Sequence, residues 1–141
     1  MAETKYGRYF TTECIPEDSI QENISLVSTR DIEDFGGGDL SVDCAIVSRP
    51  HVMTSRPHVH EFPQYLHFFS TNPKDSTDFD AEIEVCLGEE QEKHIVNRPT
   101  ALYVPAGLPH GPITFTMINK PILFVDIAVA GKYSRVNDTP D

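Results

Sequence analysis

The chain has 141 residues, which is the length of one domain with its own hydrophobic core, and its 8 Phe and 5 Tyr supply bulky material for that core. Eleven basic and 22 acidic residues give a net charge of −11, which disfavours binding to nucleic acid or to an anionic membrane.

The three cysteines, Cys14, Cys44 and Cys86, form no C-x-x-C pair, so neither a disulfide framework nor a thiolate zinc site is indicated. No apolar signal sequence is visible at the start, and the best apolar run, residues 122–130, is too short to span a bilayer. We therefore expect a cytoplasmic protein with reduced cysteines and no membrane segment.

The first third of the chain gives weak signals. Residues 1–12 carry three aromatic side chains and are compatible with an edge strand or an arm. Pro16 precedes two acidic residues, and Ile20 and Ile24 are four apart, a pattern that permits one or two helical turns. Three glycines at 36–38 then indicate a loop before a strand over residues 40–47, in which one face carries Leu40, Val42, Cys44 and Ile46.

The rest of the chain reads as a series of short strands. Residues 64–70 place Gln64, Leu66 and Phe68 on one face and Tyr65, His67 and Phe69 on the other. A polar connection at 72–80 leads to a cleanly alternating strand at 81–87, a charged turn at 88–93, and further strands near 94–96, 101–104, 113–118 and 122–129. Short strands without a long helix predict an all-β, antiparallel barrel or double-sheet jelly roll.

A candidate metal site is divided between two stretches. His58 and His60 are two residues apart and would point the same way from an extended segment. Gln64 offers an amide oxygen from the next strand, and His110 follows a tight turn at Pro105-x-Gly107. Together these residues can supply three imidazole nitrogens and one oxygen to a metal ion.

The two stretches resemble the motifs of the cupin superfamily, H-x-H, three or four residues, E, and then P-x-G, two residues, H. In this chain they read His58-x-His60-x-x-x-Gln64 and Pro105-x-Gly107-x-x-His110, with Gln64 in the place of the usual glutamate. The resemblance implies a single-domain cupin jelly-roll barrel, an antiparallel double-stranded β-helix, over residues 40–130. Residues 1–39 are then an N-terminal arm and leading segment, and residues 131–141 a C-terminal tail.

The ligand set suits one divalent transition metal, Fe, Zn, Ni, Mn or Cu, and does not choose among them. An amide in place of a carboxylate leaves the charge of the ion uncompensated, so Gln64→Glu should bind metal more tightly and anions less well. Two alternatives remain open: a barrel that has kept its shape without metal, and a Gln64 amide that lies near the metal without binding it.

Four further residues are candidates for substrate binding. Arg56 shares strand parity with His58 and His60 and could anchor a carboxylate or phosphate, although a surface arginine is the alternative. Phe68, Tyr103 and Phe115 are core material, some of which should also line the pocket of the barrel.

The leading functional hypothesis is a metalloenzyme that acts on a small anionic metabolite by oxygenase, isomerase or lyase chemistry. The alternatives are a non-catalytic small-molecule binding or sensing module, favoured by the lack of an evident acid–base residue, and a purely structural barrel. We expect a small-molecule ligand as the partner. We also expect a homodimer, because Tyr65, His67 and Phe69 and the apolar strand at 122–129 place hydrophobic groups on the outside.

Overall fold

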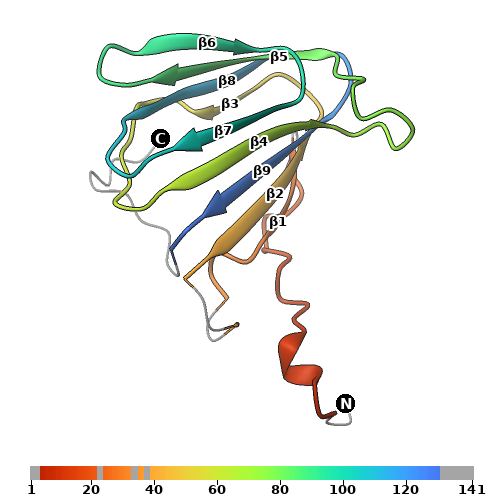
Figure 1. Ribbon diagram of the computed structural model, residues 1–141. Helices are drawn as coiled ribbons and strands as arrows, with labels where there is room; N and C mark the ends of the chain where they lie inside the picture. The colour runs from red at the N-terminus through yellow and green to blue at the C-terminus, as the bar shows by residue number, and fades with distance from the viewer. Residues whose placement is uncertain (1–3, 22–23, 33–34, 37–38, 131–141) are drawn as a thin grey trace.

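The computed structural model describes residues 4–21, 24–32, 35–36 and 39–130, and this part of the chain contains two antiparallel β-sheets (Figure 1). One sheet has the order β1-β2-β9-β4-β7: β1 Ile24–Ser28, β2 Ser41–Val47, β9 Ile122–Ala128, β4 Gln64–Ser70 and β7 Thr100–Val104. The other has the order β3-β8-β5-β6: β3 His51–Thr54, β8 His110–Ile118, β5 Ala81–Leu87 and β6 Glu92–Val96. The all-β jelly roll expected from the sequence is confirmed.

The two sheets lie face to face and bury the core between them (Figure 1). Three phenylalanines form its centre: the ring of Phe68 on β4 lies 5.2 Å from that of Phe124 on β9 and 6.2 Å from that of Phe115 on β8, between centroids. All three are at most 5% exposed. Truncating any of these rings to alanine is expected to cost about 3–5 kcal/mol.

The two faces of β4 are arranged as the sequence predicts. Gln64, Leu66 and Phe68 are buried between the sheets, whereas Tyr65 and Phe69 are 43% and 37% exposed on the outside. Since a strand alternates strictly, fixing Gln64 on the inside determines the direction of every other side chain of β4.

The apolar residues that the sequence groups on one face of β2 lie on the outside of the sheet. Val42, Cys44 and Ile46 point outward, with Ile46 45% exposed, while the inner face carries Ser41, Asp43, Ala45 and Val47. The pattern was ambiguous because small and apolar residues occupy both faces. What decides the orientation is Asp43, which pairs with the partly exposed Arg30.

The N-terminal third also departs from expectation. No helix begins at Pro16; instead a turn closes with a hydrogen bond of 3.0 Å from Ser19 N to the carbonyl of Pro16. Strand β1 follows and pairs with β2, so the five-stranded sheet begins before residue 40, within the segment assigned to the leading arm. A short 3-10 helix, η1 (Gly7–Tyr9), lies in the N-terminal segment that extends away from the sheets in Figure 1.

The strand β3 was not anticipated from the sequence, and β8 starts at His110, three residues earlier than expected. Gly37, Gly38 and the C-terminal tail, residues 131–141, lie outside the described residues.

The three cysteines are not disulfide-bonded. Among the residues that the structure describes, no helix has the length and apolar character needed to cross a membrane.

Candidate metal centre

The three motif histidines meet between the sheets. The ligand nitrogens that His58, His60 and His110 can offer all lie within 4.8 Å of one another, and the side chains are 7%, 2% and 2% exposed. Ring centroids are 4.2 Å apart for His58 and His110, and 4.9 Å for His58 and His60. Three imidazoles this close are suited to share one ion, since first-row metal–nitrogen bonds are about 2 Å long.

Backbone hydrogen bonds hold the two motifs against each other. His58 N donates to the carbonyl of His110 at 2.9 Å, and His110 N donates to the carbonyl of His58 at 3.0 Å. Gly107 N, in the Pro105 turn, donates to the carbonyl of His60 at 2.9 Å. Gly111 allows this approach: its φ is +102°, and a Cβ there would lie 2.7 Å from the carbonyl oxygen of Arg56.

The hydrogen bond of His110 fixes its ligand atom. His110 Nδ1 lies 2.9 Å from the carbonyl oxygen of Leu108, and a carbonyl can only accept, so Nδ1 carries the proton. The lone pair is then on Nε2, which is the atom left to bind a metal. His60 is held differently, by stacking on Phe62 with ring centroids 4.7 Å apart.

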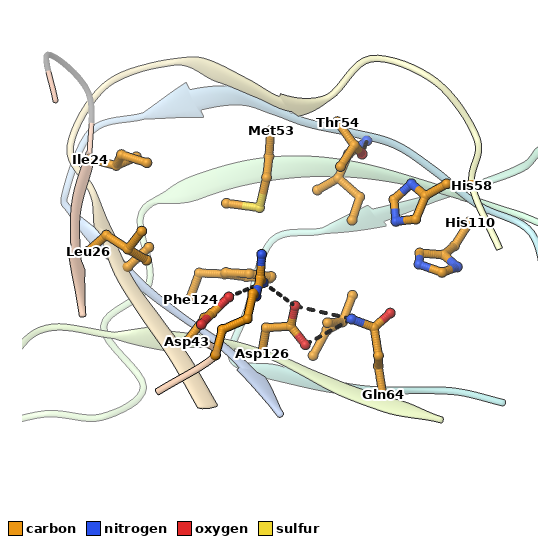
Figure 2. Close-up of a pocket in the computed structure, with 14 residues that line it drawn as sticks. Ile24, Leu26, Asp43, Met53, Thr54, His58, Gln64, His110, Phe124 and Asp126 are labelled. Carbon is orange, nitrogen blue, oxygen red and sulfur yellow. Dashed lines mark hydrogen bonds and ion pairs between the residues drawn. The ribbon is translucent and has the colours of Figure 1, made fainter. Parts of the chain in front are cut away.

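Gln64 joins the histidines from β4 and is 2% exposed. Its Nε2 donates to both carboxylate oxygens of Asp126, each at 3.1 Å, while its Oε1 is buried and has no hydrogen-bond partner among the described residues. Figure 2 shows this oxygen turned away from Asp126, to the side on which His58 and His110 lie. A buried carbonyl oxygen without a donor is costly, and a bound cation would satisfy it.

An ion-pair cluster that the sequence reasoning missed lies next to Gln64 (Figure 2). Asp43 and Asp126 are direct partners across β2 and β9, and both side chains point inward. Like charges in such a pair repel. Arg30, which follows β1, relieves this repulsion: its Nη2 is paired with Asp43 Oδ2 and lies 3.9 Å from Asp126 Oδ2, while Ser28 Oγ donates to Asp43.

The pKa of Asp126 is raised to about 6, chiefly by burial; the charge of Arg30 opposes this shift, the charge of Asp43 adds to it, and the hydrogen bond from Gln64 opposes it. The signal for this residue was present in the sequence, because Asp126 interrupts an otherwise apolar strand. Arg30 carried no comparable signal, since it lies in a segment without a clear pattern.

Two of the histidines, His58 and His110, share one cavity of about 210 Å³ with the ion-pair cluster. Its polar lining comes from His58, His110, Gln64, Thr54, Arg30, Asp43 and Asp126. Its remaining walls are apolar and include Leu26, Met53, Leu66, Ile113 and Phe124. A concave space in which polar groups converge among apolar walls is the usual form of a ligand site.

The four residues proposed from the sequence for substrate binding do not line this cavity. Arg56 is exposed, because the chain at 55–57 has left strand β3 and runs along the surface. Phe68 and Phe115 are fully buried in the core, and Tyr103 is 53% exposed on the outer face of β7, beside Tyr65. In place of Arg56, the structure brings Arg30 to the pocket.

A divalent metal fits the residues present. Three imidazoles converge, the hydrogen bond of His110 leaves its Nε2 as a ligand atom, and Gln64 directs a partnerless oxygen to the same side. This mixed nitrogen and oxygen set is typical of sites for Fe, Zn, Ni, Mn or Cu.

The chain thus has the cupin fold, two facing antiparallel sheets with the two histidine motifs meeting between them. No protein-family model matches the sequence, and no curated protein matches it either. Solved structures do share the fold. The polyketide cyclase RemF from Streptomyces resistomycificus aligns with a TM-score of 0.53 and 16% identity, over 85% of this chain and 74% of its own.

KdgF from Halomonas sp. aligns with a TM-score of 0.50 and 18% identity, over 78% of this chain and 82% of its own. Oxalate decarboxylase from Lactobacillus farciminis, solved as a formate complex, gives a TM-score of 0.54 and 14% identity, over 82% of this chain. This chain spans only 30% of that enzyme. These likenesses establish the fold and leave the chemistry to be argued from the site.

Proposed function

We propose that the protein binds one divalent transition metal through His58, His60, His110 and Gln64 and acts as a metalloenzyme on a small anionic metabolite. The observation that carries the proposal is the buried convergence of the three histidines, two of which line a small cavity. When bound, the metal would act as a Lewis acid or oxygen-binding centre for oxygenase, isomerase or lyase chemistry.

The charges around the cavity support an anionic ligand. Three imidazoles and an amide contribute no charge, so a bound ion keeps its charge of +2. Arg30 contributes +1 and the ionised Asp43 and Asp126 −2, which gives +2 + 1 − 2 = +1 for the loaded site. A ligand with one negative charge at the metal end would neutralise it.

The size and lining of the cavity limit that ligand further. A volume of 210 Å³ lies below the range of about 300–1,000 Å³ that is usual for ligand pockets, so the ligand is a small metabolite. Leu26, Met53 and Phe124 line the cavity with apolar groups. Arg30 is already paired with Asp43, so away from the metal the cavity favours a neutral hydrogen-bonding group over a second carboxylate.

Two carboxylates favour catalysis over passive binding. The sequence offered no evident acid–base residue, but Asp43 and Asp126 both line the cavity that His58 and His110 share. A carboxylate within reach of a metal-bound ligand is a candidate for moving a proton. The shared fold is also used by enzymes, among them the polyketide cyclase and the oxalate decarboxylase. A non-catalytic binding or sensing module is the second candidate.

Metal analysis of protein purified without added metal or chelator tests the first part of the proposal. We expect about one equivalent of a first-row metal per chain. Metal-loaded protein should then bind small monocarboxylates more tightly than dicarboxylates of similar size, as measured by calorimetry. Absence of metal, with none taken up on addition of Zn²⁺ or Mn²⁺, would contradict the metal site. Binding without turnover of any bound acid would favour the sensing module.

We further propose that two copies pair through the outer face of the five-stranded sheet. Val27, Ile46, Tyr65, Phe69 and Tyr103 on this face are 37–53% exposed. The outward side chains of these strands include no carboxylate, lysine or arginine, so two copies with a charge of −11 can meet there without opposing carboxylates. Closed two-fold pairing is the commonest arrangement for such a face.

Light scattering at micromolar concentration should give about twice 15.8 kDa. Tyr65→Asp should shift the protein towards the monomer, because it places a charge in the centre of the pairing face. Ile95→Asp is the matched control, since Ile95 is 45% exposed on β6 of the other sheet. A wild-type monomer at high salt would contradict the pairing.

A further inference from the structure

The side-chain amide of Gln64 has two ends of nearly the same shape and opposite chemistry. Its oxygen can bind a metal, whereas its NH₂ group can only donate hydrogen bonds. A half-turn about the last side-chain bond exchanges the two ends, so packing alone barely distinguishes them. A chemical partner must decide which end faces the histidines.

Asp126 is placed to make that decision. Both of its carboxylate oxygens lie 3.1 Å from Gln64 Nε2, and an ionised carboxylate only accepts hydrogen bonds. It points inward from β9, where it pairs with Leu66, one inward position along β4 from Gln64. Turning the amide round would bring its oxygen against the carboxylate, with two acceptors in contact and no proton between them.

We propose that Asp126 is a positioning residue of the metal centre, which holds the Gln64 amide so that Oε1 faces the ion. This inference rests on the proposed metal site. It also changes the expectation for Gln64: the pair of Gln64 and Asp126 carries the one negative charge that a glutamate ligand would carry, moved one side chain away from the metal.

The effect of Gln64→Glu therefore depends on residue 126. With Asp126 present, the substitution places two carboxylates about 3 Å apart, and their repulsion offsets much of the gain from a charged ligand. With Asp126→Asn as well, the asparagine NH₂ can donate to the new carboxylate, which faces the metal. The double substitution thus exchanges the positions of the amide and the carboxylate.

The test is Zn²⁺ affinity, measured by competition with a chelator, in wild type, Gln64→Glu, Asp126→Asn and the double variant. In the wild-type background, Asp126→Asn should weaken binding about 10–100-fold, because the amide is no longer held in one orientation. In the Gln64→Glu background, the same substitution should strengthen binding. A reversal of sign is not expected of a residue that only supports the fold.

Two further measurements complete the test. The visible spectrum of the Co²⁺-loaded protein should change with Asp126→Asn and return towards its intensity in the double variant, since it reports the ligands directly. Asp43→Asn is the matched control: it touches the same Arg30 but has no hydrogen bond to Gln64, so its effect should be equal in both backgrounds.

The outcomes separate the two proposals. If Asp126→Asn changes Zn²⁺ affinity by the same factor in both backgrounds, the positioning role is wrong while the metal site stands. If wild type and all variants fail to bind Zn²⁺, the proposed function falls and the positioning role with it. Circular dichroism of each variant shows whether a loss of affinity reflects unfolding.

Discussion

Replacing His110 by alanine should abolish stoichiometric metal binding while leaving the barrel folded. His110 supplies one of three convergent nitrogens, and its Nε2 is left as the ligand atom by the hydrogen bond from Nδ1 to Leu108. Loss of groups that merely support metal ligands costs about 10–100-fold in affinity, so loss of a ligand should cost more. The measurement is metal content after dialysis against a weak chelator, with Zn²⁺ affinity by competition.

The fold should survive because the two backbone hydrogen bonds between His58 and His110 do not involve the side chain. His94→Ala is the control: His94 lies on β6, is paired with Glu92 and is exposed, so its loss should leave metal content unchanged. A full metal equivalent in the His110→Ala protein would show that the ion is held elsewhere. An equal loss in both variants would indicate an effect unrelated to the site.

The sequence predicted the fold well where the chemical role of one residue determined which face of its strand lies inside. In β4, the ligand role of Gln64 assigned Leu66 and Phe68 to the core and Tyr65 and Phe69 to the outside, and the structure confirms this. The strands β4 and β5 have the predicted boundaries, because their alternation is bounded by turn residues. The motif spacing likewise predicted the meeting of His58, His60 and His110.

The sequence did not decide which face of β2 lies inside. In β2, alternation favoured Val42, Cys44 and Ile46 as one apolar face, yet Asp43 points inward and Ile46 outward. The reason is tertiary: Asp43 is stabilised by Arg30, 13 residues earlier, which no local pattern connects to it. Arg30 follows β1, a strand that the sequence did not predict. An ion pair made from such a segment cannot be anticipated from the sequence.

The same limit explains why the residues proposed for substrate binding do not line the cavity. Arg56 was chosen because, in a regular strand, it would point the same way as His58, two residues later. The chain between β3 and β4 is not a regular strand, so this alternation does not hold across Pro57. The arginine that does reach the cavity follows β1. Of the aromatic residues proposed for the lining, Phe68 and Phe115 fill the core and Tyr103 lies on the outer face. Other apolar side chains, such as Leu26 and Met53, line the cavity in their place.

The second large effect is expected from Arg30→Ala. Asp43 and Asp126 are direct cross-strand partners on the inner face, both side chains are little exposed, and Arg30 is the cation paired with them. Removing one member of a buried ion pair costs about 3–5 kcal/mol, because the remaining charge is left in a poorly solvated position. Arg30 is one-third exposed, so we expect about 3 kcal/mol, the lower end of that range.

Urea unfolding of the metal-free proteins at neutral pH measures this loss. Arg56→Ala is the matched control, since Arg56 is exposed and outside the cavity, and its effect should stay within about 0.5 kcal/mol. Adding Asp43→Asn to Arg30→Ala should recover part of the stability, because it removes one of the two opposed charges. If Arg30→Ala costs no more than Arg56→Ala, the carboxylates are not held by this arginine, and the charge assigned to the loaded site would have to be revised.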